Sequence, residues 1–333
     1  MSMKRYLYTL TALLGLLPVS AHAHVRYLVD TNAVEVHGGT DTSYLLEALT
    51  DTHNMGLMLW TIACVIIAYL LATQVRCIRN TLKKIGDRAD GYGVFTPWML
   101  RLSLGIALIG AGTSSYLISP ALPEFPAFAT LQIFLGFMLM AGFLVVPASI
   151  AAIGVYVFAV VTDWYLIGNI DFFAIALALI VLDNERPGID DLLGLPKISP
   201  LHTLRRYVPF ILRCGIGVAM MFLAVYEKLL NPHLSELIVT GFGLQNVVPV
   251  SAAMWVVGAG IIEFLIGAAL VLGLYTRTTA AIAFIVLSLS FFYFGEDVAS
   301  HITLFGILAV LFIMQGGRWS VDRTLGHTNP EFH

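Results

Sequence analysis

The stretch WVVGAGIIEFLIGAALVLGLYTRTT, residues 255–279, decides the fold. It is long and apolar enough to cross a bilayer as one helix, which takes about 20 apolar residues. Its single carboxylate, Glu263, lies near the middle. An ionisable side chain at membrane depth is energetically costly, so it is by default a candidate for function. We therefore treat Glu263 as the first candidate catalytic residue, a proton donor or acceptor.

Small residues surround this carboxylate on the predicted helix. Side chains three before and four after Glu263 share its helix face, and both positions are glycines, Gly260 and Gly267. Small residues allow another backbone or a ligand to approach closely. The carboxyl group is therefore expected to project from a strip of small residues, and Arg277 is expected to mark the water boundary.

The composition of the chain predicts an all-α integral membrane protein. Of its 333 residues, 58% are hydrophobic and only 12% are charged, and the mean hydropathy is +0.85. An ordinary soluble domain is about 25% charged. Lysine and arginine are scattered at helix ends, so the expected partner is the lipid bilayer and not nucleic acid. No GxxxxGK[ST], GxGxxG or HExxH occurs, which disfavours an ATPase, a nucleotide-dependent dehydrogenase and a zinc protease.

Hydropathy divides the chain into a signal peptide and about nine helices. Residues 1–23 have a basic start, an apolar core and small residues at the end, as secretory signals do. Residues 24–97 hold a periplasmic segment, the first transmembrane helix and a cytoplasmic loop. The nine predicted spans lie at about 54–73, 98–118, 128–146, 148–165, 170–183, 208–229, 251–273, 278–294 and 300–315.

Positive charges set the predicted orientation. Lysine and arginine favour the cytoplasmic side of membrane proteins. With the mature N-terminus in the periplasm and the C-terminus in the cytoplasm, only Arg26 and Lys228 fall on the outer side. The cytoplasmic residues are Arg76, Arg79, Lys83, Lys84, Arg88, Arg186, Lys197, Arg205, Arg206, Arg277, Arg318 and Arg323. This predicts a multi-pass protein of a bacterial inner membrane.

An internal repeat organises the chain after the first span. LRLSLG at 100–105 matches LRCGIG at 212–217, and RPGIDDLLG at 186–194 aligns with RWSVDRTLG at 318–326. Each block contains four spans, so the copies are expected to be parallel. The fold is then one leading helix plus two four-helix bundles. The predicted boundaries are 98–194 for the first block, 195–206 for a cytoplasmic linker, 207–326 for the second block and 327–333 for a tail.

The second block keeps ionisable groups where the first has neutral ones. Glu263 falls opposite Gln132, and Arg277 falls opposite Val146. His301 similarly aligns with Asn169. Chemistry is therefore predicted in the second block, and the first is interpreted as a scaffold or partner surface.

The second block resembles the DoxX family of four-helix inner-membrane proteins. The matching residues are Leu212-Arg213, Glu227-Lys228-Leu229, Asn231-Pro232, Glu263 with Gly267, GLYTR at 273–277, His301 and GRWSVD at 317–322. The resemblance covers about 205–325 well and 98–194 in outline, as in two tandem copies. It implies a subunit or partner of a quinone-linked redox system, with quinone as the one cofactor to expect and a redox partner subunit. Nothing in the spacing or composition independently indicates quinone chemistry.

The remaining candidate residues have structural alternatives. Arg213, Lys228, Gly260, Gly267, Arg277 and His301 are candidates for substrate binding. Glu263 could instead be a hydrogen-bonded packing residue. Arg213 could extend to the interface as arginines do near helix ends, and Arg277 could be a topological anchor. Glu227 and Lys228 could form an interfacial ion pair.

Two other functions stay open at this point. One is a non-enzymatic transport or assembly protein for a small molecule or lipid, which parallel repeats also suit. The other is periplasmic copper handling through His24, His53 and His301, although no ligand-spaced pair predicts a metal site. The sequence does not decide whether the protein is an enzyme.

Overall fold

The computed structural model describes residues 40–120, 122, 124–182, 188–195 and 201–324. The predicted signal peptide, His24 and the tail from residue 327 lie outside the described residues, and the side chain of His53 is not described. Every regular element in the described part of the chain is helical, and the one β-bridge there, Tyr116 with Glu124, is isolated. The all-α class is therefore confirmed.

The helices follow one another along the chain with short connections. They are α4 (Thr42–Thr50), α5 (Thr52–Gln74), α6 (Arg76–Asp90), η1 (Gly93–Phe95), α7 (Thr96–Thr113), α8 (Pro126–Ala141), α9 (Val145–Thr162), η2 (Trp164–Asn169), α10 (Ile170–Leu182), α11 (Ile189–Leu192), η3 (His202–Tyr207), α12 (Val208–Leu223), η4 (Ala224–Leu230), α13 (Pro232–Gly241), α14 (Leu244–Val247), α15 (Ala252–Leu272), α16 (Thr276–Phe294), α17 (Val298–Met314) and α18 (Val321–Thr324).

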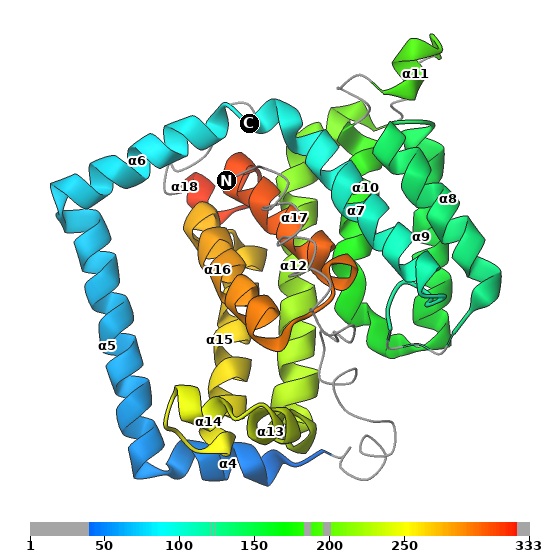
Figure 1. The fold of residues 1–333 in the computed structure, drawn as a ribbon. Coiled ribbons are helices and arrows are strands. Elements are labelled where there is room, and N and C mark those ends of the chain that lie inside the picture. Colours follow the sequence, from blue (N-terminus) through cyan, green and yellow to red (C-terminus); the bar gives the residue numbers. More distant parts are fainter. Residues whose placement is uncertain (1–39, 121, 123, 183–187, 196–200, 325–333) are drawn as a thin grey trace, which may run out of the picture.

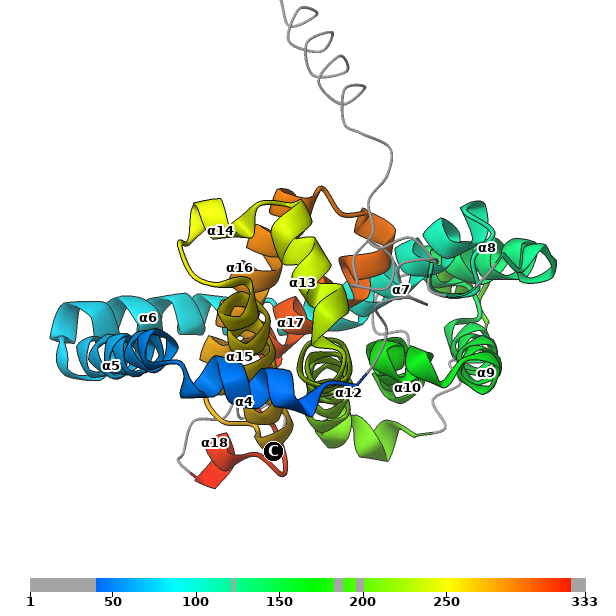
Figure 2. The ribbon, with the colours of Figure 1, turned by 90° about the horizontal axis from the view of Figure 1, so that it is seen from below.

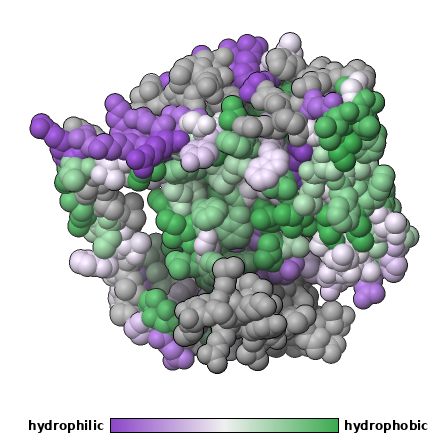
Figure 3. All heavy atoms as spheres, turned by 45° about the horizontal axis from the view of Figure 1, so that its top comes forward, coloured by the Kyte–Doolittle hydropathy of each residue, from purple (hydrophilic) through white to green (hydrophobic). Residues whose placement is uncertain are grey.

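Six helical segments of the described chain are long and apolar enough to span a membrane. They are Gly93–Thr113, Val145–Thr162, Trp164–Leu182, Thr203–Leu230, Ala252–Leu272 and Thr276–Phe294. The other three predicted spans correspond to shorter apolar helices, Asn54–Cys64, Pro126–Ala141 and Val298–Met314. The chain is thus a multi-pass membrane protein. Figure 3 shows the hydrophilic residues of α6 at one edge and a broad hydrophobic surface beside them.

Two predicted spans end too late. The first is the span over 98–118, because α7 ends at Thr113. The second is the span over 128–146, predicted to end just before Pro147, because α8 ends at Ala141. Gly142 and Leu144 then adopt left-handed backbone conformations, with φ of 67° and 47°. Pro147 lies inside the first turn of α9, where a helix tolerates proline because the backbone N–H there has no partner within the helix.

In the described chain the two predicted blocks interlock into one body, whereas the sequence predicts two four-helix bundles. Helix α7 packs extensively against α17, and α12 packs extensively against α10 (Figure 1). The first helix of each block thus contacts the last helix of the other more than the last helix of its own. Hydropathy identifies spans but does not specify which spans pack together, so the sequence did not indicate this exchange.

The two blocks share local geometry at matched positions. Arg101 donates hydrogen bonds to two carbonyl oxygens in the last turn of α8, and Arg213 does the same in the last turn of α15. The last carbonyls of a helix lack the usual partner one turn further on. Leu139 and Leu270 also accept from the N–H groups of Gly142 and Gly273, so the arginine adds to the glycine cap. A left-handed glycine follows each helix, Gly142 with φ 67° and Gly273 with φ 66°.

A short closing helix completes each block in the same way. In α11, the Asp190 carboxylate accepts a hydrogen bond from the backbone N–H of Leu144 at 3.0 Å. In α18, the Asp322 carboxylate accepts one from the backbone N–H of Tyr275 at 2.6 Å. Both closing helices lie at the same end of the molecule (Figure 1).

The leading helices stand beside this body. Helix α5 runs from α4 at one end to α6 at the other, and α6 turns from there toward the bundle (Figure 1). Helix α5 has its main contacts with α4 and α6, and large apolar side chains such as Leu59 and Trp60 stay exposed. Figure 2 shows α4 lying across the ends of α12 and α15.

Arg277 joins α6 to the bundle. Its guanidinium forms an ion pair with Asp90 at the end of α6 and donates to the carbonyl oxygen of Phe312 in α17 at 2.7 Å. A Cβ atom on Gly86 would lie 2.5 Å from the guanidinium, so α6 passes close to it. Arg277 therefore connects α6 to α17, in addition to its predicted position at the boundary with water.

Replacing this arginine is expected to loosen α6. In Arg277→Gln, amide hydrogen exchange across α6 should accelerate about tenfold, which corresponds to about 1.4 kcal/mol of local opening free energy. Exchange in α12 and α15 should stay unchanged. Arg88→Gln is the control, because Arg88 is an exposed basic residue of the same helix. Equal exchange in both variants would contradict a holding role for Arg277.

Candidate functional site

An ion pair between two membrane-spanning helices forms the centre of the candidate site. The Lys228 Nζ lies 2.7 Å from Oε2 of Glu263. Lys228 belongs to η4, a π-helical continuation of α12, and such segments are frequent at functional sites. The side chains are 17% and 26% exposed, so the pair is reachable from the surface of the bundle.

Glu227 adds a second carboxylate and a link to the first block. It is buried, and its Oε1 accepts a hydrogen bond from the hydroxyl of Tyr165 in η2. Its other oxygen lies 3.9 Å from the Lys228 Nζ, and its backbone carbonyl accepts from Ser235 Oγ at 2.9 Å. Glu227 is thus held on three sides, whereas Lys228 is the only hydrogen-bond partner of Glu263 in the described chain.

The glycines near Glu263 have different roles. A Cβ atom on Gly260 would lie 3.0 Å from the Cβ of Lys228, so a glycine here allows the lysine stem to lie against α15. Gly267 faces Gly217 of α12, and a Cβ on it would lie 2.7 Å from the Gly217 carbonyl oxygen. Gly260 therefore belongs to the ion-pair region, and Gly267 belongs to the helix crossing.

His301 forms a second buried pair close to the first. Its Nε2 lies 2.8 Å from Oε2 of Glu296, and both side chains are 5% exposed. Its Nδ1 lies 3.1 Å from the backbone carbonyl of Asp297 and 3.1 Å from Ser300 Oγ. Glu296 also acts electrostatically on Lys228. Three carboxylates therefore act on this one ammonium group.

Arg213 lies away from this group and does not extend to the interface. It is fully buried, with Nη1 bonded to the carbonyl oxygens of Leu270 and Val271 and Nη2 bonded to those of Arg318 and Trp319. The expectation that the side chain extends to the interface does not describe this position. The last carbonyls of a buried helix lack their usual partners one turn further on. The guanidinium donates to them here, and the Leu270 carbonyl accepts from the Gly273 N–H as well.

Helix α4 covers the end of the bundle beside the ion pair. It packs against α15 and η4, and the backbone N–H of Asp41 donates to the Leu230 carbonyl at 3.0 Å. The Asp41 carboxylate lies 3.1 Å from His233 Nε2. A hydrogen bond from the Ser43 hydroxyl lowers the pKa of Asp41, and burial raises the pKa of Tyr44.

The structure thus brings some of the predicted candidates together and separates the others. Lys228, Glu263 and Gly260 come together, and His301 lies nearby through Glu296. Arg213, Gly267 and Arg277 support helix packing elsewhere. No group of three or more His, Cys, Asp or Glu side chains that could hold a metal ion occurs among the described residues.

Three contributors were not identified from the sequence. The sequence does not mark Tyr165 as a site residue, because tyrosines are common near membrane surfaces. Asp171 is a buried acid at the start of the apolar run IDFFAIALALIVL, and this charge was a signal that could have been used. Glu296 lies five residues before His301 in the sequence, but its electrostatic effect on Lys228 depends on the fold.

The fold and the ion pair define a multi-pass α-helical membrane protein with charged groups inside its bundle. Residues 208–296 match the DoxX family model. The match lies in the second block, and it supports the predicted resemblance to DoxX for this part of the chain, which includes Lys228 and Glu263. No curated protein and no solved structure matches the chain.

Proposed function

We propose that the protein is a DoxX-like subunit or partner of a quinone-linked redox system in a bacterial inner membrane, and that Lys228 and Glu263 bind the quinone headgroup. The observation that carries the proposal is the 2.7 Å ion pair inside a membrane bundle, with both side chains partly exposed. Charged groups at this depth are expensive and are usually functional.

The chemistry of this pair fits a quinone headgroup. An ammonium group has three N–H donors, of which Glu263 takes one, so Lys228 can also donate to a quinone carbonyl. The Glu263 carboxylate can accept from a quinol hydroxyl. Next to Glu263 on α15, Ile262 and Leu265 are exposed and apolar, and they provide a surface for a hydrophobic tail.

In this proposal, the chain supplies the protons for quinone reduction. Quinone reduction takes up two electrons and two protons, and in this proposal the partner subunit supplies the electrons. Glu263 and Glu227 are the two carboxyl groups within reach of Lys228, and they are the candidates to hold and deliver the protons. The Tyr165 hydroxyl positions Glu227.

The first block is, in this proposal, a degenerate second copy that no longer carries the chemistry. Gln132 occupies the position that matches Glu263. Its side chain accepts from the backbone N–H of Ile118 at 2.9 Å and donates to the carbonyl of Tyr116 at 2.7 Å. A neutral amide that holds a loop supports a structural role for this position.

The same proposal includes the orientation. The end of the molecule that carries α6 is cytoplasmic, and the end that carries α4 and α13 is periplasmic. The exposed basic residues of α6, among them Lys83 and Lys84, support this assignment through the preference of positive charge for the cytoplasmic side.

Titration with a short-chain quinone tests the proposal. The wild-type protein in lipid nanodiscs should bind saturably, and Glu263→Gln should weaken binding about tenfold, or about 1.4 kcal/mol. The amide keeps the size of the side chain but removes the charge paired with Lys228. Glu236→Gln is the control, because Glu236 is an acidic residue on α13. Absent binding, or equal affinity in all three proteins, would overturn the proposal.

A further inference from the structure

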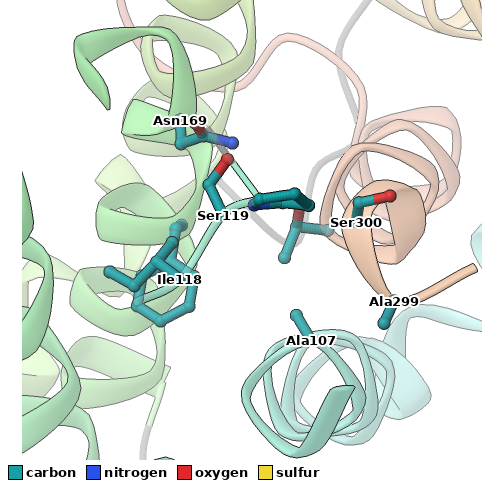
Figure 4. Close-up of a pocket in the computed structure, with 9 residues that line it drawn as sticks. Ala107, Ile118, Ser119, Asn169, Ala299 and Ser300 are labelled. Atoms are coloured by element: carbon teal, nitrogen blue, oxygen red, sulfur yellow. The ribbon is translucent and has the colours of Figure 1, made fainter. Parts of the chain in front are cut away.

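A small polar pocket lies where the two blocks interlock. Its wall comes from α7, the loop after α7, the junction of η2 with α10, and the start of α17. Figure 4 shows Ser119 and Asn169 directed toward each other on one side, with Ala107 and Ala299 on another. Ser300 and Thr303 also line it. Several polar groups therefore gather at the end of an apolar bundle.

The pocket leads directly to His301. Ser300, which lines the pocket, has its hydroxyl 3.1 Å from Nδ1 of His301. The opposite ring nitrogen, Nε2, lies 2.8 Å from the Glu296 carboxylate. An imidazole can accept a proton at one nitrogen and release another from the second. His301 therefore stands between the pocket and Glu296, and Glu296 acts in turn on Lys228.

A buried carboxyl group faces the same histidine. Asp171 on α10 is 1% exposed, and neither of its oxygens has a hydrogen bond of ordinary geometry with a described residue. The groups that act on it are the Thr303 hydroxyl, the backbone N–H groups of Asp171 and Phe172, and the His301 imidazole of α17. It acts in turn on Tyr156 of α9. A buried carboxyl group without a hydrogen bond of ordinary geometry needs an explanation. Here it provides a counter-charge when His301 carries a second proton.

We propose that this pocket is the water-filled entrance of a proton relay. His301, starting with its proton on Nε2, takes a proton at Nδ1 from the pocket side through the Ser300 hydroxyl and releases the Nε2 proton to the Glu296 carboxylate. The ring is left with its proton on Nδ1, which can donate to the Asp297 carbonyl. One proton enters and one leaves, so no electrons move. Glu296 then delivers to the region of Lys228 and Glu263. This last delivery rests on the proposed function, whereas the steps from the pocket to Glu296 do not.

The first experiment tests whether water reaches the pocket. In a background with serine at the three cysteine positions, Ser300→Cys should react with a membrane-impermeant methanethiosulfonate. Ser149→Cys should stay unmodified, because Ser149 is fully buried in α9. Unreactive Ser300→Cys under conditions that label exposed Ser114→Cys would overturn the proposal.

The second experiment measures the relay itself. Time-resolved infrared spectra after an external pH jump should show the carboxyl band of Glu296, identified by its loss in Glu296→Gln. The band should respond at least about tenfold more slowly in His301→Gln and in Ser300→Cys after modification. Modified Ser114→Cys should respond like the wild type. Equal rates in all variants would overturn the relay.

Quinone titration of the same samples separates the two proposals. If the relay operates but no quinone binds, the proposed function and the final delivery from Glu296 to Lys228 and Glu263 are overturned. The steps from the pocket to Glu296 then stand. Quinone binding with a response that is independent of His301 would leave the proposed function and remove the relay.

Discussion

Lys228→Met is expected to destabilise the bundle by about 3 kcal/mol or more. Methionine has a similar length but no charge, so the carboxylates of Glu263, Glu227 and Glu296 lose the ammonium group that acts on all three. Glu227 is buried, whereas Lys228 and Glu263 are partly exposed. Removing one partner of a fully buried pair costs about 3–5 kcal/mol, so we expect the lower end of that range here. Reversible denaturation of the purified protein in mixed micelles measures this difference in the free energy of unfolding.

A double-mutant cycle provides the control for Lys228→Met. Glu263→Gln alone should cost less, since Glu227 and Glu296 still have Lys228. The double variant should regain about 1 kcal/mol or more relative to the sum of the singles, because the neutral amide that replaces the Glu263 carboxylate needs no cation. If Lys228→Met unfolds within about 0.5 kcal/mol of the wild type, Lys228 does not hold these carboxylates together.

The membrane-spanning segments were predictable because burial in lipid requires long apolar helices. The exchange of packing partners between the blocks was not predictable. Beyond the polar residues near their starts, α10 and α17 are apolar on every side, so either could face α7 or α12. The break after Ala141 was obscured by Pro147, which is usually a helix terminator but here lies in a first turn. Hydropathy has no information about these choices.

The sequence identified only part of the candidate site, because a charge within an apolar run is recognisable whereas its contacts are not. A carboxylate in the middle of an apolar run, Glu263, stands out in any sequence. Its partner Lys228 was visible as a charged residue but was placed at the outer interface, whereas its ammonium group reaches Glu263 within the bundle. The bonds of Arg213 to backbone carbonyls were invisible, because every residue has a carbonyl group.

The helix crossing beneath this site gives the second large effect, in Gly267→Ala. A Cβ atom at Gly267 would lie 2.7 Å from the Gly217 carbonyl oxygen and 2.8 Å from the Cγ of Met221. Both obstacles are on α12, and one is backbone, so α12 and α15 must separate. Overpacking of this kind typically costs about 1–3 kcal/mol, and we expect the upper end here. The same denaturation experiment measures the loss.

Gly258→Ala is the matched control, because Gly258 lies on the same helix with free space beside it. A Cβ atom there would meet only the terminal methyl group of Met254, at 3.9 Å. Alanine also favours helix over glycine by about 1 kcal/mol, so this variant should be as stable as the wild type or slightly more stable. Gly217→Ala approaches the same contact from α12, where its Cβ would lie 2.6 Å from the Gly267 carbonyl oxygen, and it should match Gly267→Ala. If both variants keep wild-type stability, α12 and α15 do not cross at these glycines, and the position of Lys228 against Glu263 would have to be revised with them.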